Sequence, residues 1–309
     1  MISDRLAFAL GRLDLTPSYR KLISSVGQAY LHSQFNHYRA CQPPVLLPFL
    51  CCEANGVNPL RAIGVTTSWF LLHVAAHVLD KVEDQELPVL ELTTHGQGVC
   101  TNLSTGMIFV AEWILNHLEL DSVDAGAAWD IQRAFQETIL SVCSGQHLDL
   151  STPTPDLSTC WEIAKTKSGS AFALACYAGT RTSTSITDRL FHFSNFGRFL
   201  GTIVQISDDL KDLEIDALRH KKAQTHSPLA YAYLSHLGLT SSDAPYSEIQ
   251  SKTDLPSIQN SLVLYLRLEA MKYAEMARNE LNEITLVQSP QNELVRMLNH
   301  LAWLGATVN

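Results

Sequence analysis

The feature that most constrains the fold is a long run of apolar residues between positions 60 and 84. The run follows the turn sequence Gly56-Val57-Asn58-Pro59, and Pro88 lies just beyond its end. It predicts one long helix that is apolar on nearly every side, and such a helix belongs at the centre of a bundle. Hydrophobic residues make up 46% of the 309 residues and charged residues only 17%, so a large buried core is expected.

Further helices are predicted on both sides of this central helix, and no segment shows convincing strand alternation. Pro44 and Pro59 suit the first turn of a helix, while the polar segment 238–256 is predicted to be a loop. The simplest architecture is a single all-α domain over residues 1–309. The other helices are predicted at residues 18–38, 45–54, 102–118, 123–147, 159–179, 187–212, 258–284 and 291–304, and one more opens at Ser227-Pro228.

Charge and cysteine content exclude several classes of protein. The net charge of −9 argues against a nucleic-acid partner, which needs a basic surface. The seven cysteines are scattered and include no CxxC pair, so neither a zinc site nor a disulfide framework is indicated. We expect a cytoplasmic location, because reduced thiols fit a reducing compartment and the N-terminus lacks the apolar run of a signal peptide. No integral membrane segment is expected, because no window has the length of a clean transmembrane helix.

Two groups of acidic residues lie at the ends of apolar helices. Asp80 and Asp84 are four residues apart, with Glu83 close to the same face, and the segment 205–212 places Gln205, Asp208, Asp209 and Asp212 on one face. Carboxylates at a helix C-terminus oppose the macrodipole, and such local conflicts occur at functional sites. A hard divalent cation such as Mg²⁺, carrying a phosphorylated substrate, would neutralise them. The alternatives are a solvated helix end and an ion pair with Lys81 or another helix.

The chain resembles the trans-isoprenyl diphosphate synthase (polyprenyl synthetase) family, the prenyltransferase branch of the class I isoprenoid synthases. Four blocks between residues 39 and 232 carry the resemblance, and the last keeps the whole QxxDDxxD pattern. The blocks are Leu71-Leu72-His73 with residues 80–84, Gly145-Gln146-His147-Leu148-Asp149-Leu150, Lys167-Ser168-Gly169-Ser170-Ala171-Phe172, and residues 205–212. The resemblance implies an isoprenoid synthase-like helical bundle with a central apolar cavity between the two acidic helices.

The chemistry that the resemblance implies is the Mg²⁺-assisted ionisation of an allylic isoprenyl diphosphate, with three Mg²⁺ ions bound to the diphosphate. It assigns metal binding to Asp80, Asp84, Asp208, Asp209 and Asp212. It also assigns a diphosphate contact to Lys167, which could instead be a surface residue. The catalytic residues are then expected to be Asp80, Asp84, Lys167 and Asp208. The expected substrate contacts are Glu83, Gln146, Lys167, Gln205, Lys221 and Lys222, although Gln146 and Asp149 could simply form a helix C-terminal turn.

Departures from the family pattern affect the second substrate. Lys81 stands where the family has the second aspartate of its first motif. Arg39 is the only basic residue in the region of the family's GGKRxRP-like segment, and no Lys or Arg lies between Asp84 and Arg133. A second diphosphate, that of isopentenyl diphosphate, therefore has few partners.

We therefore expect ionisation of one allylic diphosphate, followed by terpene-cyclase-like closure or by prenyl transfer to another acceptor. The alternatives are an ordinary chain-elongating synthase and a non-catalytic regulatory subunit. By analogy with the family, the small residues Ala75 and Ala76 leave a deep cavity and imply a substrate of about 15 to 20 carbons. Trp69 and Phe70 would form its floor or would be plain core aromatics. A homodimer is expected from the resemblance.

Overall fold

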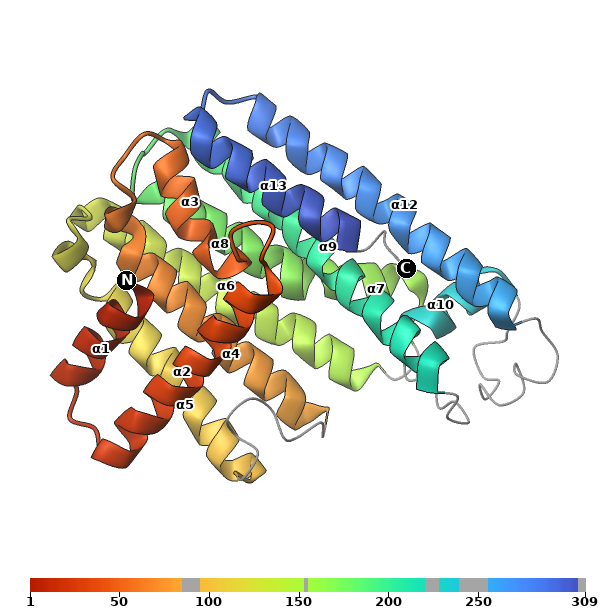
Figure 1. The fold of residues 1–309 in the computed structure, drawn as a ribbon, viewed down its shortest axis with the longest axis horizontal. Coiled ribbons are helices and arrows are strands. Elements are labelled where there is room, and N and C mark those ends of the chain that lie inside the picture. The colour runs from red at the N-terminus through yellow and green to blue at the C-terminus, as the bar shows by residue number, and fades with distance from the viewer. Residues whose placement is uncertain (85–94, 153–154, 220–227, 239–254, 305–309) are drawn as a thin grey trace. The chain divides into compact units, whose positions relative to one another are not determined.

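The computed structural model describes residues 1–84, 95–152, 155–219, 228–238 and 255–304. For some helical residues it describes the backbone but not the side chain, namely 212–219, 228, 230–231, 234, 255–259 and 303–304. Every regular element within these ranges is helical, as predicted (Figure 1). The elements are α1 (Ile2–Arg12), α2 (Pro17–His37), η1 (Pro44–Leu46), α3 (Leu47–Ala54), η2 (Pro59–Ala62), α4 (Ile63–Glu83), α5 (Gln97–Leu115), η4 (Leu118–Asp121), α6 (Ala125–Ser151), α7 (Leu157–Ala164), η5 (Lys165–Gly169), α8 (Ser170–Arg181), α9 (Thr187–Arg219), α10 (Pro228–His236), α12 (Leu255–Asn282) and α13 (Gln288–Leu304).

The helix boundaries agree with the sequence in several places and differ in others. Pro44 and Pro59 each begin a 3₁₀ turn, which confirms their predicted position at helix starts. Helix α1 was not predicted, and α9 continues to Arg219 because its periodicity persists beyond the acidic motif. The predicted helix 159–179 is confirmed, with helical backbone over residues 157–181, but the five residues of η5 between α7 and α8 form a π-helical turn that was not predicted. Most of the predicted loop 238–256 lies outside the described residues.

The chain divides into two compact units. Unit 1 consists of residues 1–135, 175–193 and 285–297, and unit 2 of residues 136–174, 194–284 and 298–309. Helices α6, α8, α9 and α13 each contribute residues to both units. Whether the two units act as the single domain expected from the sequence stays a prediction.

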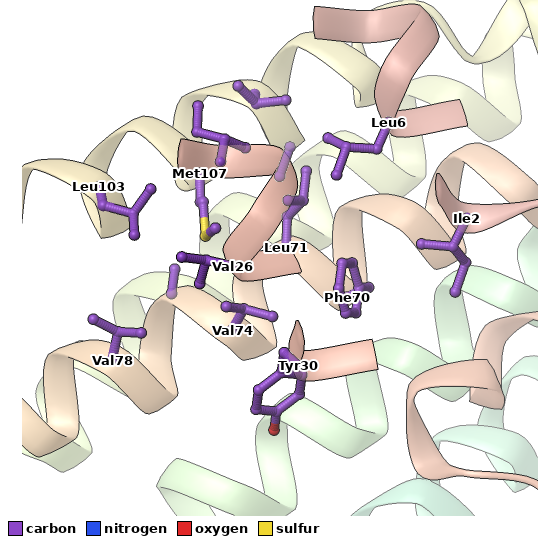
Figure 2. Packing of buried hydrophobic residues seen from close by; sticks show 14 of the residues in the cluster. Ile2, Leu6, Val26, Tyr30, Phe70, Leu71, Val74, Val78, Leu103 and Met107 are labelled. Atoms are coloured by element: carbon purple, nitrogen blue, oxygen red, sulfur yellow. The ribbon is translucent and has the colours of Figure 1, made fainter. Parts of the chain in front are cut away.

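The core of unit 1 is built around α4, as the apolar run predicted. Phe70, Leu71, Val74 and Val78 are buried in a cluster with residues from α1, α2 and α5 (Figure 2). Phe70 therefore belongs to the core, as one of its two interpretations predicted, while its role as a cavity floor stays a prediction. Two buried hydroxyls, those of Thr66 and Thr67, are satisfied by donating to carbonyl oxygens one turn earlier in the helix.

Two helical segments are long and apolar enough to cross a membrane by length and composition alone, contrary to the sequence prediction. They are Pro59–Glu83 and Gln97–Leu115, and 67% of the most apolar window of the first is buried inside the protein. A core helix passes the same test, and α4 packs along α5 in unit 1. The buried cluster accounts for the apolar character of α4.

Candidate active site

Two residues of the predicted site, Gln146 and Asp149, lie in the C-terminal part of α6, which belongs to unit 2. The helix continues to Ser151, so Gln146 and Asp149 lie in its last two turns and both are half-buried. The alternative interpretation as a helix C-terminal turn is therefore correct as regards local structure. It does not exclude a functional role, because Asp149 also binds a side chain from another element.

Lys167 lies on the π-helical turn η5 and forms an ion pair with α6. Its Nζ is 2.7 Å from Oδ2 of Asp149, and the two side chains are 19% and 34% exposed. Lys167 is therefore partly buried and ion-paired and not a solvated surface residue, while its contact with a diphosphate stays a prediction. π-helical turns are rare and frequently lie at functional sites, because the extra residue redirects side chains. This turn leaves a partly buried ammonium group next to a carboxylate.

The residue after Lys167 connects η5 to the second acidic motif. The hydroxyl of Ser168 donates to Oε1 of Gln205 at 3.0 Å, and Nε2 of Gln205 donates to Oδ1 of Asp209 at 3.2 Å. Gln205 is thus held from both ends of its amide, and one carboxylate oxygen of Asp209 is oriented by it. Spacing on one helix face predicted the Gln205–Asp209 proximity, but the Ser168 contact spans 37 residues and was not predicted.

Close approach of three elements at this site depends on glycine. A Cβ on Gly201 would lie 2.3 Å from the carbonyl oxygen of Ser168, and a Cβ on Gly145 would lie 3.1 Å from Cγ of Lys167. Gly169 faces the carbonyl oxygen of Arg198 at 3.4 Å by the same measure. Glycines at these positions of α6, η5 and α9 therefore let Asp149, Lys167, Ser168 and Gln205 meet.

The remaining acids of the second motif differ in their surroundings. Asp208 is 56% exposed, and its Oδ1 accepts a hydrogen bond from Nζ of Lys211 at 2.8 Å. Exposed ion pairs of this kind are weak, so another cation could replace the lysine ammonium group. Behind this face, the buried hydroxyl of Ser207 lies 3.1 Å from the carbonyl oxygen of Leu301 in α13, which anchors α9. The side chains of Asp212, Lys221 and Lys222 lie outside the described residues.

The Cys160 thiol in α7 is partly buried and lies near three carboxylates of unit 2. Burial, followed by the charges of Asp209, Asp149 and Asp156, raises the pKa of the Cys160 thiol to about 12. The thiol is therefore protonated at neutral pH and is a poor ligand or nucleophile. The three carboxylates near this thiol favour cations on this side of the unit.

The first acidic motif lies at the end of α4 in unit 1. The helix ends at Glu83, and Asp84 is its C-cap, whose N–H donates to the carbonyl oxygen of Asp80 at 2.9 Å. Asp80 and Lys81 are half-buried, whereas Glu83 and Asp84 are exposed. The predicted placement of these carboxylates at the C-terminal end of the central helix is confirmed.

The carboxylates of the two acidic motifs are suitable ligands for a hard cation, although neither motif forms a complete metal site by itself. Among the residues that the structure describes, no three His, Cys, Asp or Glu side chains form a group that could hold a metal ion. The two motifs belong to different units, so joint metal binding by both stays a prediction. Carboxylate oxygens are nevertheless the ligands that Mg²⁺ prefers, and both motifs supply them: Glu83 and Asp84 are exposed at the end of α4, and on α9 Asp208 is exposed and Asp209 half-buried.

Comparison with known proteins identifies a family model that matches part of the chain and solved structures that share its fold. Residues 46–226 match the family described as "Polyprenyl synthetase". No protein with curated annotation matches the sequence.

Among solved structures, a geranylgeranyl pyrophosphate synthetase from Geoglobus acetivorans is 20% identical, with a TM-score of 0.76 over 97% of this chain and 96% of that one. A geranylgeranyl pyrophosphate synthase from Lactobacillus brevis is 18% identical, with a TM-score of 0.71 over 98% and 95%. A decaprenyl diphosphate synthase from Rhodobacter capsulatus is 12% identical, with a TM-score of 0.69 over 98% and 93%. At these identities the likeness shows the all-α isoprenoid synthase fold.

Proposed function

Because the chain belongs to the polyprenyl synthetase family, we propose that it is an isoprenoid synthase that removes diphosphate from an allylic isoprenyl diphosphate with Mg²⁺. The arrangement around η5 carries this proposal. Lys167 is held by Asp149 on one side, and Ser168 holds Gln205 and thereby Asp209 on the other. A lysine and an oriented carboxylate on neighbouring elements are what a departing diphosphate and its counter-ion require.

The carboxylates that would hold Mg²⁺ are those of Asp80, Asp84, Asp208, Asp209 and Asp212. Bound there, Mg²⁺ would neutralise the negative charge that develops on the departing diphosphate. Lys167 donates to a diphosphate oxygen as a point charge, and Asp149 keeps its ammonium group in position. Gln205 presents an amide of fixed orientation next to the reacting carbon. The apolar helices exclude water, which would quench the allylic cation.

After ionisation, the allylic cation is proposed to react without isopentenyl diphosphate, so that the enzyme uses a single prenyl diphosphate. Arg39 is exposed, and its Nε donates to the carbonyl oxygen of Asn36 at the end of α2. With no other basic residue in that segment, and none between Asp84 and Arg133, the chain offers little to bind isopentenyl diphosphate. The cation of a substrate of about 15 to 20 carbons would then cyclise or react with another acceptor, as in terpene synthase-like enzymes.

Ordinary chain elongation is the second candidate, and it is favoured by the family to which the chain belongs. A regulatory subunit without activity is the third. The ion pair between Lys167 and Asp149 argues against this last candidate, because burying a paired ammonium group has a desolvation cost that a non-catalytic surface would not need.

The deciding experiment incubates the purified protein with Mg²⁺ and geranyl, farnesyl or geranylgeranyl diphosphate, with and without isopentenyl diphosphate. Products are identified by mass spectrometry, and diphosphate release is measured in the same samples. A hydrocarbon or alcohol from the allylic substrate alone supports the cyclase-like function. A longer diphosphate formed only with isopentenyl diphosphate supports elongation, and no turnover of any mixture contradicts the proposed enzyme.

Two variants on the same helix test the metal assignment. Asp208→Asn should slow diphosphate release by about a hundredfold, because one carboxylate is lost from the group that stabilises developing charge. Asp188→Asn is the matched control, since Asp188 is 73% exposed at the start of α9 and interacts only weakly with His192. Chelation of Mg²⁺ should abolish release in both variants and in the wild type, and equal rates in the two variants would contradict the assignment of Asp208.

A further inference from the structure

A group of aromatic rings in unit 2 connects α7 to α10 and α12. Trp161 of α7 contacts Tyr265 and Tyr273 of α12, with ring centroids 6.2 Å and 6.1 Å away. Tyr233 of α10 stacks on Tyr265, with centroids 5.2 Å apart and ring planes 25° from parallel. All four side chains are buried or half-buried, and all four residues belong to unit 2. The group therefore joins three helices at the level of α7.

Two hydrogen bonds set the directions of these rings. The indole N–H of Trp161 donates to Oη of Tyr265 at 2.9 Å, across 104 residues of sequence. The hydroxyls of Tyr233 and Ser261 share a hydrogen bond of 2.7 Å, and Ser261 lies one turn before Tyr265 on α12. Ring contacts tolerate several geometries, whereas a hydrogen bond weakens steeply away from its preferred angle. The polar atoms therefore specify an orientation that phenylalanine rings in the same places would not.

Helix α7 is too short to hold its own orientation. It has 8 residues, and helices shorter than about 12–15 residues are marginal without tertiary contacts. Its first turn is capped by the carboxylate of Asp156, which accepts from the N–H of Thr159 at 2.7 Å. Its last residue, Ala164, continues directly into the π-helical turn η5. Trp161 is thus the point at which α12 holds the middle of the helix.

The position of Lys167 depends on the orientation of α7. Lys167 follows Trp161 by 6 residues, which at 1.5 Å per residue span about 9 Å, so a tilt of α7 by about 6° moves the far end by about 1 Å. The distance from Nζ of Lys167 to Oδ2 of Asp149 is 2.7 Å, and about 1 Å more takes it beyond hydrogen-bond range. On the other side, Ser168 is held by Gln205 at 3.0 Å. The backbone that carries Lys167 is therefore fixed before it by Trp161 and after it by Ser168.

We propose that Tyr265 is a positioning residue, which acts through Trp161 and α7 to hold the ammonium group of Lys167 where it meets the departing diphosphate. This role rests on the proposed function. Loss of the Tyr265 hydroxyl leaves the half-buried indole N–H of Trp161 without its acceptor, and an unmade hydrogen bond of this kind is costly. Helix α7 then tilts, and Lys167 moves away from the leaving group.

The first test compares Tyr265→Phe with Tyr19→Phe, in the presence of Mg²⁺ and the allylic diphosphate that the wild type consumes fastest. Tyr19 is the matched control, because its hydroxyl donates to the carbonyl oxygen of Asn102 at 2.9 Å in unit 1, so that each variant keeps its ring and loses one hydrogen bond. Tyr265→Phe should lower kcat for diphosphate release about tenfold and change KM little, because Lys167 acts on charge that develops as the bond breaks. Tyr19→Phe should keep both quantities. A wild-type kcat in Tyr265→Phe would overturn the assignment.

The same substitution in a Lys167→Ala background shows whether Tyr265 acts through Lys167. With the ammonium group absent, Tyr265→Phe should slow diphosphate release no further. A structural role independent of Lys167 would instead reduce the rate about tenfold in both backgrounds, because effects of unconnected sites add as free energies. Such an additive loss would contradict the proposal.

Chemical labelling tests the hold on Lys167 without any turnover. The protein without substrate is treated briefly with acetic anhydride, and acetylation of Lys167 relative to Lys165 is measured by mass spectrometry of peptides. Lys165 is exposed on the same turn and serves as the internal control, whereas Lys167 is 19% exposed and ion-paired. The ratio should rise about threefold or more in Tyr265→Phe, because local opening then exposes the ammonium group more often. It should stay unchanged in Tyr19→Phe.

The two kinds of measurement separate failure of this inference from failure of the proposed function. An unchanged labelling ratio in Tyr265→Phe contradicts the hold of Tyr265 on Lys167, whatever the activity. If the ratio rises but the wild type releases no diphosphate from any allylic substrate, the proposed function fails. The role of Tyr265 in ionisation then fails with it, while its structural hold on Lys167 is confirmed.

Discussion

Gly201→Ala tests whether the close approach of α9 and η5 is needed for activity. The added Cβ would lie 2.3 Å from the carbonyl oxygen of Ser168, 2.7 Å from its carbonyl carbon and 2.9 Å from Cβ of Phe172. The first two atoms are backbone, so no side-chain rotation relieves the clash. An ordinary contact begins at 3.4 Å, and α9 and η5 must therefore separate by about 1 Å.

A movement of this size breaks the hydrogen bond between Ser168 and Gln205, which in turn orients Asp209. The bond from Ser168 Oγ to Gln205 Oε1 is now 3.0 Å long, and about 1 Å more takes it beyond hydrogen-bond range. Overpacking of this kind costs about 1–3 kcal/mol of unfolding free energy. Misplacement of a catalytic group by about 1 Å can reduce the rate by about a hundredfold. We therefore expect Gly201→Ala to lose both stability and diphosphate release.

Two matched glycines separate these effects, measured by urea unfolding and by diphosphate release. Gly179→Ala in unit 1 would place its Cβ against the backbone of Pro48, so it should lose similar stability but keep its activity per folded molecule. Gly11→Ala in α1 meets nothing within 4 Å and should be neutral or stabilised by up to about 1 kcal/mol. If Gly201→Ala behaves like Gly11→Ala in both assays, the reasoning about close packing at the site is refuted.

Three further predictions concern charge and exposed surface. Asp149→Asn should slow diphosphate release about tenfold by releasing Lys167, while thermal unfolding shifts little, because the desolvation cost of this partly buried ion pair offsets much of its attraction. His73 has a pKa near 4 in the folded protein against 6.5 when exposed, so below pH 6.5 the unfolded chain binds the proton more strongly. Stability should then fall by at most about 3 kcal/mol between pH 6.5 and 4, and urea unfolding of His73→Phe should show a flatter profile. Phe109 and Trp129 are 69% and 65% exposed, and if a second copy covers them, Phe109→Glu with Trp129→Glu should halve the mass measured by light scattering.

The parts of the fold that the sequence predicted are those in which local pattern and tertiary role agree. The apolar run of α4 needed no distant partner to predict a central helix, and its buried cluster confirms that position. The acids at 80–84 and 205–209 were placed on common helix faces because spacing along a helix sets side-chain direction. The family was predictable because four ordered blocks preserve chemistry as well as helicity.

The parts that the sequence did not predict depend on contacts between distant residues. Helix α1 is short, and no residue in it marks chemistry, although its buried Ile2 and Leu6 join the unit 1 core. The Lys167–Asp149 pair could have been suspected from two charged residues in neighbouring motifs. The bond from Ser168 to Gln205 could not, because serine is common in helices and its partner lies 37 residues away.

The π-helical turn shows why the site and the local sequence disagree. Residues 165–169 contain nothing that disfavours an α-helix strongly except Gly169, and a wide turn has poorer hydrogen-bond geometry than an α-helical one. The turn must therefore be stabilised from outside, and the structure supplies the contacts: Asp149 from α6 holds Lys167, and Gln205 from α9 holds Ser168. Consecutive residues thus bind two different helices, at positions where Gly145 and Gly201 permit close approach. A continuous α-helix with apolar contacts would be more stable than this π-helical turn with its polar contacts. The turn is therefore better explained by the need to position Lys167 than by a contribution to stability.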